Sequence, residues 1–187
     1  IYAGGGVITA EASSQLTELA ERADIPVVST LMNLGAISRK HPLSLGMVGM
    51  HGQKEANQAV YHSDLLITVG ARFSDRVTGD VSHFAPNAVI AQIDIDESEI
   101  DKNVVVDFSL IGDMKEILGK LIGKTEEKKN PAWLAEIDSF RTPKNIAEDA
   151  FVPQNIFKMI QKVLGDDVIV ATDVGQHQMW TAQEWPF

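Results

Sequence analysis

The sequence contains no cysteine, which excludes disulfide bonds, thiolate metal sites and cysteine nucleophiles. It has no apolar run near the roughly 20 residues of a membrane-spanning helix, and its first residues lack the basic-then-apolar pattern of a signal peptide. Basic residues are scarce, because 16 Lys and Arg stand against 26 Asp and Glu and give a formal net charge of −10. Proteins that bind phosphate backbones carry clustered Lys and Arg. The composition therefore argues against nucleic acid or a membrane as partner and favours a cytoplasmic protein.

The overall composition is that of an ordinary globular protein. Hydrophobic residues make up 44% and charged residues 22% of the 187 positions, which argues against disorder. The length allows one or two domains. The chain begins with a short stub before Gly4-Gly5-Gly6, and it closes on the aromatic cluster at 185–187. We therefore expect it to be a section cut from a longer polypeptide.

Hydrophobic spacing predicts alternating helices and strands. Ala12, Leu16, Leu19 and Ala23 recur at helical spacing and predict a helix over 10–23. The other expected elements are helices at 53–61, 114–122, 133–140 and 154–164 and strands at 26–31, 65–70, 88–95, 104–112 and 168–173. Apolar strands without in-out alternation are typical of a parallel sheet covered by helices. The predicted fold class is therefore α/β, with a doubly wound parallel sheet.

Composition divides the chain into three sections. We place an α/β domain at residues 1–122. A charged stretch closed by Pro131 and a short helix form the expected linker, residues 123–150. One helix, one strand and a loop cannot enclose a core, so residues 151–187 are expected to be the truncated start of a second α/β domain. Within the first domain, residues 33–52 have little periodicity and are long for a connection, which favours a functional loop.

Three glycines, Gly4, Gly5 and Gly6, follow the first expected strand and open a helix. Glycines at such a turn let backbone N–H groups approach a pyrophosphate. The match to the dinucleotide fingerprint is imperfect, because Thr9 stands in place of the third glycine and the second strand ends in Thr30-Leu31-Met32 without a ribose-binding acid. The alternative is a glycine cluster that packs a helix against the sheet, and the spacing leaves both interpretations open.

Two further glycine-containing segments offer groups to a ligand. Gly49-Met50-His51-Gly52 combines glycines for close backbone approach with a thioether suited to a flat apolar ligand. In isolation, His51 is better explained as an ordinary loop or N-cap histidine. Gly70-Ala71-Arg72 and Asp75-Arg76 follow a predicted parallel strand, at the edge where α/β sheets bind ligands. The two arginines could pair with a phosphate or carboxylate. They could instead form surface ion pairs with Asp75, which are worth little.

Polar groups also follow the remaining expected strands. Asp94-Ile95-Asp96 and Gly112-Asp113 could meet a ribose or face water. The run from Asp173 to Trp180 offers a glycine and Gln-His-Gln donors to a phosphate, or it simply starts a helix. No metal site is predicted within the chain, because three of its histidines lack partners at metal-ligand spacing and are expected to be structural or solvent-facing: His41, His62 and His83.

Taken in order, these motifs closely resemble the large catalytic subunit of acetolactate synthase (acetohydroxyacid synthase). The resemblance runs over essentially the whole chain, and its most specific motif is Asp173-Val174-Gly175-Gln176-His177-Gln178-Met179-Trp180. In that family the first domain supplies the glutamate that activates thiamine diphosphate, the middle domain binds FAD, and the third binds the diphosphate and magnesium. The resemblance implies that this chain is the whole Rossmann-like FAD-binding domain with the start of the third domain.

The resemblance also assigns roles residue by residue. The residues matched to FAD contacts are Gly4, Gly5, Gly6, Thr30, Leu31, Met32, Gly49, Met50, His51, Gly70, Ala71, Arg72, Asp75, Arg76, Val77, Asp94, Ile95, Gly112 and Asp113. Those matched to the thiamine diphosphate phosphates are Val174, Gly175, Gln176 and His177, while Gln178 and Met179 also face the flavin. Arg76 is placed towards the 2-ketoacid, and no catalytic residue is expected within the chain. Ser74 departs from the family, which usually has a second aspartate there.

The activity that the resemblance implies is that of a thiamine diphosphate- and magnesium-dependent transferase. It decarboxylates pyruvate and joins the two-carbon unit to a second 2-ketoacid, pyruvate or 2-ketobutyrate, in branched-chain amino acid biosynthesis. FAD is then largely structural, and the enzyme is a homo-oligomer, a dimer or tetramer, with a small regulatory subunit. The chain alone is expected to be inactive, since thiamine diphosphate and magnesium are held mainly by parts outside it. Two alternatives stay open: the middle domain of a pyruvate oxidase or glyoxylate carboligase, and a stand-alone nucleotide-binding module.

Overall fold

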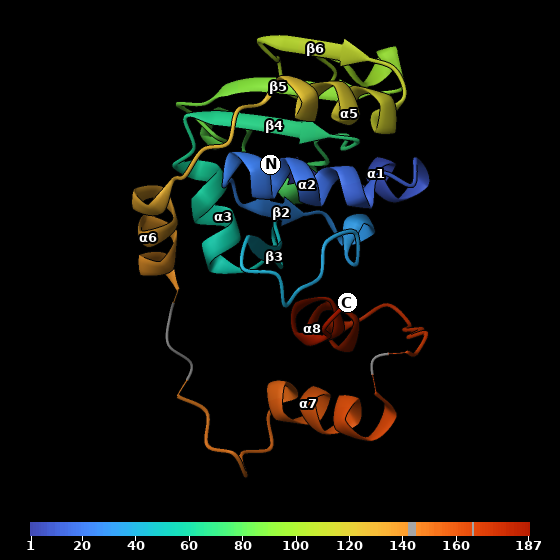
Figure 1. Cartoon of the computed structure of the whole chain (residues 1–187). Helices are drawn as coiled ribbons and strands as arrows, with labels where there is room; N and C mark the ends of the chain where they lie inside the picture. Colours follow the sequence, from blue (N-terminus) through green and yellow to red (C-terminus); the bar gives the residue numbers. More distant parts are fainter. Residues whose placement is uncertain (142–144, 166) are drawn as a thin grey trace.

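In the described part of the chain, residues 1–141, 145–165 and 167–187, six parallel strands form one sheet (Figure 1). The computed structural model orders them β3, β2, β1, β4, β5 and β6, with bounds Ser44–Met47, Val27–Ser29, Tyr2–Ala3, Leu65–Val69, Val89–Asp94 and Phe108–Ile111. Every neighbouring pair is parallel. The 3-2-1-4-5-6 order is that of a doubly wound α/β domain. The predicted fold class is confirmed.

Helices cover both faces of the sheet (Figure 1). On one face lie α1 (Gly6–Thr9), α2 (Ser13–Ala23) and α5 (Met114–Lys124), with α2 packed against α5. On the other lie α3 (Lys54–Tyr61) and α6 (Pro131–Phe140), which pack together. Crossovers between parallel strands are right-handed. Connections that move across the sheet from β1 towards β3 therefore lie on one face, and connections that move in the opposite direction lie on the other face.

Each face of the sheet has its own hydrophobic core. Beneath α2 and α5, buried residues such as Leu16 and Leu118 pack against the sheet. On the other face the Tyr2 ring stacks on Phe73 with centroids 5.6 Å apart and meets Phe84 edge-on at 6.2 Å. Burying a large apolar side chain contributes roughly 1.5–3 kcal/mol. These two cores therefore fix the strands whose carboxyl ends carry the candidate site.

Three of the differences from the prediction in the first section of the chain have a structural cause. Residues 33–52, expected to be a loop, contain β3, whose strand pattern is interrupted by Gly46 at φ +79°. β6 begins at Phe108 instead of 104, because Val104 turns into the core before the strand pairs with β5. α5 continues to Lys124, into the predicted linker, where a basic side chain in the last turn complements the helix dipole.

Residues 151–187 form two helices that pack together, α7 (Pro153–Leu164) and α8 (Gln176–Glu184). The strand expected at 168–173 is wrong. Ile169 in this segment is fully exposed, and no strand in the described residues pairs with it. An apolar run does not form a strand by itself, because cross-strand pairing supplies the stability of a sheet.

The end of α8 docks on the loop that follows β3. The Gln183 side chain donates a hydrogen bond to the His51 carbonyl at 2.7 Å, and the Gln53 side chain donates to the Gln183 carbonyl at 3.0 Å. The Arg39 amide donates to the Phe187 carbonyl at 3.1 Å. These contacts hold the carboxyl-terminal helix beside the carboxyl edge of the sheet (Figure 1).

Candidate functional site

The candidate site begins at the switch point of the sheet, between β1 and β4. Gly4 and Gly6 follow β1, and Gly70 follows β4 with φ +58°. A Cβ on Gly4 would lie 2.2 Å from the Gly70 carbonyl oxygen, so the two turns touch through backbone atoms. The Gly4 amide donates to the Val69 carbonyl at 2.8 Å and the Gly6 amide to the Gly70 carbonyl at 3.1 Å. These two N–H groups bond the two strand ends to each other and are therefore already used within the fold.

The segment after β2 lies next to the glycine turn that follows β1. A Cβ on Gly5 would lie 3.1 Å from the Met32 Cβ, which places the two residues next to each other. The Thr30 amide donates to the Ala3 carbonyl at 2.9 Å, while Leu31 and Met32 are exposed, Met32 by 72%. The structure therefore brings the predicted residues 30–32 to the predicted glycine turn, with apolar side chains open to a ligand.

The turn Gly49–Gly52 packs against the segment that carries Arg76. Gly49 has φ +112°, and a Cβ on it would lie 2.9 Å from the Arg76 carbonyl oxygen. The Met50 amide donates to the same oxygen at 2.9 Å. Met50 is 72% exposed, and Val77 lies against Gly49. The predicted residues 49–51 and 75–77 thus form one contiguous surface.

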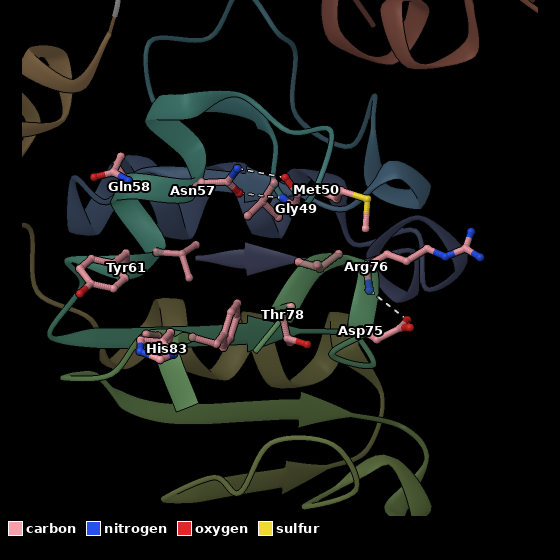
Figure 2. Close-up of a pocket in the computed structure, with 15 residues that line it drawn as sticks. Gly49, Met50, Asn57, Gln58, Tyr61, Asp75, Arg76, Thr78 and His83 are labelled. Atoms are coloured by element: carbon pink, nitrogen blue, oxygen red, sulfur yellow. Dashed lines mark hydrogen bonds between the residues drawn. The ribbon is translucent and has the colours of Figure 1, made fainter. Parts of the chain in front are cut away.

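The short helix α4 (Asp75–Thr78) displays the Arg76 guanidinium (Figure 2). The Asp75 carboxylate accepts hydrogen bonds from the Arg76 amide at 2.9 Å and from the Ser74 hydroxyl at 3.2 Å. Among the ion pairs between described residues, none involves Arg72 or Arg76. The alternative of a surface pair with Asp75 is therefore not formed, and the guanidinium is available to an anionic ligand.

Carboxylates at the ends of β5 and β6 have structural partners. Asp94 is buried and accepts a hydrogen bond from the Asp96 amide at 3.1 Å, and its carbonyl accepts one from the Gly112 amide at 3.0 Å. Asp113 caps α5 by accepting from the Glu116 amide at 3.0 Å. Hydrogen bonds from Ser98 hold the pKa of the neighbouring Asp96 carboxyl below its usual range. Of these strand-end residues, Ile95 is the apolar side chain left open, at 73% exposure.

A pocket of about 410 Å³ opens between α3 and the segment 75–85 (Figure 2). Its lining includes the predicted residues Gly49, Met50, Asp75, Arg76 and Val77. Figure 2 shows the Arg76 and Met50 side chains at the same end, pointing away from Tyr61 and His83 at the other. The predicted residues Arg76 and Met50 therefore lie together at one end of this pocket.

The segment predicted to meet the diphosphate lies at the start of α8. Val174 is 83% exposed, and Gln176 and His177 are also exposed. The opposite end of α8, at Gln183, is the part that contacts the Gly49–Gly52 turn. The structure thus links the two predicted cofactor segments through one helix without placing their predicted contact residues side by side.

The histidines examined for metal binding have other partners. His41 pairs with Glu21 at 3.1 Å, His83 with Asp80 at 3.0 Å, and His62 stacks on the Phe140 ring with centroids 5.1 Å apart. The described residues hold no cluster of three or more His, Asp or Glu that could bind a metal ion. They also contain no helix that is both long and apolar enough to cross a membrane.

Three residues that support the site were not predicted from the sequence. The Asn57 amide holds Gly49 by two hydrogen bonds, at 2.8 and 3.0 Å. The Gln92 side chain donates to the Ala71 carbonyl at 3.5 Å, and the Asn103 side chain donates to the Arg72 carbonyl at 3.0 Å. Each of these residues lies on a different element from the turn that it supports, so no local sequence motif indicates its role.

The sheet order defines a doubly wound α/β domain, a class in which ligands typically bind at the switch point of the sheet, here between β1 and β4. Residues 1–121 match the family model described as thiamine pyrophosphate enzyme, central domain. The chain belongs to this family.

Similarity to individual proteins is more specific. The chain is 47% identical over 97% of its length to a probable acetolactate synthase large subunit of Methanocaldococcus jannaschii, covering 33% of that protein. It is 46% identical over 98% of its length to the acetolactate synthase large subunit of Parasynechococcus marenigrum, covering 31%. It is 41% identical over its full length to the acetolactate synthase isozyme 1 large subunit of Escherichia coli, covering 34%. The chain therefore spans about a third of these relatives, and the resemblance inferred from the motifs is confirmed.

Proposed function

We propose that the chain is the FAD-binding central part of an acetolactate synthase catalytic subunit. The observation that carries this proposal is that the glycine turns after β1 and β4 and the loops after β2, β3 and β5 converge on one edge of the sheet. Such an edge suits an extended dinucleotide. Among thiamine diphosphate enzymes, the similarity to acetolactate synthases selects pyruvate and a second 2-ketoacid, pyruvate or 2-ketobutyrate, as substrates.

The residues present fit a flavin nucleotide. Gly4 and Gly70 let the two turns pack backbone against backbone, which brings the ends of β1 and β4 together at the proposed ligand edge. Exposed Met32, Met50 and Ile95 supply apolar contacts along the same edge. Buried apolar surface contributes about 25 cal/mol per Å², so these side chains would gain most by covering a flat ring. The proposed contacts are the residues matched by the resemblance, from Gly4 to Asp113.

Arg76 is proposed to orient the substrate. Its guanidinium can hold a 2-ketoacid carboxylate through two parallel hydrogen bonds, and it carries no competing ion pair within the described residues. The exposed segment from Val174 to His177 would contact the diphosphate of the second cofactor, with Gln178 and Met179 towards the flavin. When bound, thiamine diphosphate supplies the electron sink for decarboxylation, while the protein supplies orientation and electrostatics.

The wider assignments rest on the same likeness. Residues 1–122 would form the flavin unit, residues 123–150 the linker, and residues 151–187 part of the thiamine diphosphate unit. Magnesium would be held by groups outside this chain. The relatives are named large subunits, which supports a small regulatory subunit as partner. A homo-oligomer and a cytoplasmic location complete the proposal.

The proposal is tested with the complete gene product that carries this sequence. Supplied with pyruvate, thiamine diphosphate, magnesium and FAD, it should form acetolactate in a colorimetric assay, with host enzyme removed by a knockout strain. Two results would contradict it. Peroxide formation from pyruvate would indicate a pyruvate oxidase, and carboligation of glyoxylate without acetolactate would indicate a glyoxylate carboligase.

A further inference from the structure

The Asn57 side chain bonds both backbone polar groups of Gly49, its N–H and its C=O. It lies within α3, and its side-chain oxygen accepts a hydrogen bond from the Gly49 amide at 2.8 Å. Its side-chain nitrogen donates to the Gly49 carbonyl at 3.0 Å (Figure 2). A primary amide that pairs with both groups of one residue copies the hydrogen bonding of a neighbouring strand. Gly49 is thereby held at its left-handed φ of +112°.

The position of Gly49 fixes two side chains at the candidate site. The Met50 amide reaches the Arg76 carbonyl at 2.9 Å, and a Cβ on Gly49 would lie 3.1 Å from the Val77 Cα. Displacing Gly49 therefore moves the Arg76 backbone as well as Met50. Figure 2 shows the Met50 and Arg76 side chains leaving this contact towards the same side, away from Asn57.

We infer that Asn57 is a positioning residue, which sets the location of Met50 and Arg76 relative to the flavin and the 2-ketoacid. This inference rests on the proposed function for the identity of the two ligands. Asn57 does not meet either ligand; it acts through the Gly49–Gly52 turn. The Gln183 side chain of α8 donates a hydrogen bond to the His51 carbonyl at 2.7 Å and thus contacts the same turn.

Asn57→Ala removes both hydrogen bonds, and Asn57→Asp keeps the acceptor but places a carboxylate against the Gly49 carbonyl. Gln58→Ala is the matched control, because Gln58 is the next residue of α3, lines the same pocket, and makes no side-chain hydrogen bond to the turn among the described residues. Loss of one hydrogen bond typically changes an equilibrium about fivefold, and Asn57→Ala loses two. We therefore expect Asn57→Ala to raise the FAD dissociation constant and the KM for pyruvate about tenfold in the complete gene product, with kcat changed less.

A second readout is independent of both ligands. Hydrogen–deuterium exchange of the Gly49 and Met50 amides should speed up about tenfold or more in Asn57→Ala, and stay unchanged in Gln58→Ala. Asn57→Asp keeps the acceptor for the Gly49 amide, so this amide should exchange more slowly in Asn57→Asp than in Asn57→Ala. Unchanged exchange in Asn57→Ala would overturn the inference. Faster exchange with an FAD dissociation constant and KM within twofold of the parent would also overturn it, since the turn would then be held without positioning anything. A parent protein that neither binds FAD nor uses pyruvate would refute the proposed function. Hydrogen–deuterium exchange would still show whether Asn57 holds the Gly49–Gly52 turn.

Discussion

Gly6 and Gly70 are in direct backbone contact across the switch point of the sheet. A Cβ on Gly6 would lie 2.8 Å from the Gly70 Cα, and a Cβ on Gly70 would lie 2.7 Å from the Gly6 Cα. The Gly6 amide donates to the Gly70 carbonyl at 3.1 Å. Glycine is therefore required at both positions by the fold itself. The same contact brings the ends of β1 and β4 together at the switch point.

Gly70→Ala should destabilise the protein strongly. The residue has φ +58°, where a Cβ costs about 1–2 kcal/mol, and the added atom also meets the Gly6 backbone. We expect a loss of at least about 2 kcal/mol in the free energy of unfolding. Urea denaturation followed by circular dichroism measures it. A loss below about 0.5 kcal/mol would show that the two turns separate freely.

Gly119→Ala should have the opposite effect. Gly119 lies inside α5, and a Cβ built on it meets nothing within 4 Å. Alanine is favoured over glycine within a helix by about 0.5–1 kcal/mol. The same denaturation experiment should show this gain. Destabilisation would mean that α5 is not helical at this position.

Tyr2 should make the protein sensitive to alkali. Its ring is fully buried against Phe73 and Phe84, and burial raises the pKa of the phenol above its usual value. Above about pH 10 the unfolded chain loses this proton and the folded chain keeps it. Ionisation then favours unfolding, and stability falls by up to about 1.4 kcal/mol per pH unit.

Tyr2→Phe separates this effect from other alkaline titrations. The variant has no phenol, so its stability should decline less between pH 9 and 11, as measured by urea denaturation at each pH. Identical declines in parent and variant would contradict a buried, neutral Tyr2.

Arg76→Lys should lower kcat/KM for pyruvate in the complete gene product while flavin stays bound. A guanidinium grips a carboxylate with two hydrogen bonds, and an ammonium offers a point charge. Loss of such a contact costs about 1.5–3 kcal/mol, or one to two decades in kcat/KM. Arg76→Ala should be worse. Steady-state kinetics with flavin content measured alongside decides it: unchanged kcat/KM removes the substrate role, and lost flavin moves Arg76 to the cofactor.

Much of the fold follows from local pattern. The spacing of Leu16 and Leu19 identifies α2, and the apolar runs ending at Gly70 and Asp94 identify β4 and β5. β3 was not predicted, because Gly46 interrupts its strand pattern and its register with β2 is irregular at Val27 and Val28. The expected strand at 168–173 shows the converse, since a strand pattern without a pairing partner gives no strand.

The candidate site was only partly accessible from sequence. Glycines and arginines after strands mark the edge, because parallel strands bring their carboxyl ends together. The carboxylate of Asp113 could be assigned to a cap only once α5 was seen to start there. Asn57 carried no signal, since its partner Gly49 lies on another element and the pairing exists only after β3 and α3 pack.

Flavin binding by the purified chain tests the central claim most directly. FAD fluorescence should be quenched in a saturable manner as the chain is added. The binding should be weak, because the chain spans about a third of the length of its relatives. Excess NAD should leave the quenching unchanged, and Gly70→Ala should abolish it in the fraction that stays folded. NAD binding with no response to FAD would contradict the assignment of the strand-end surface to a flavin.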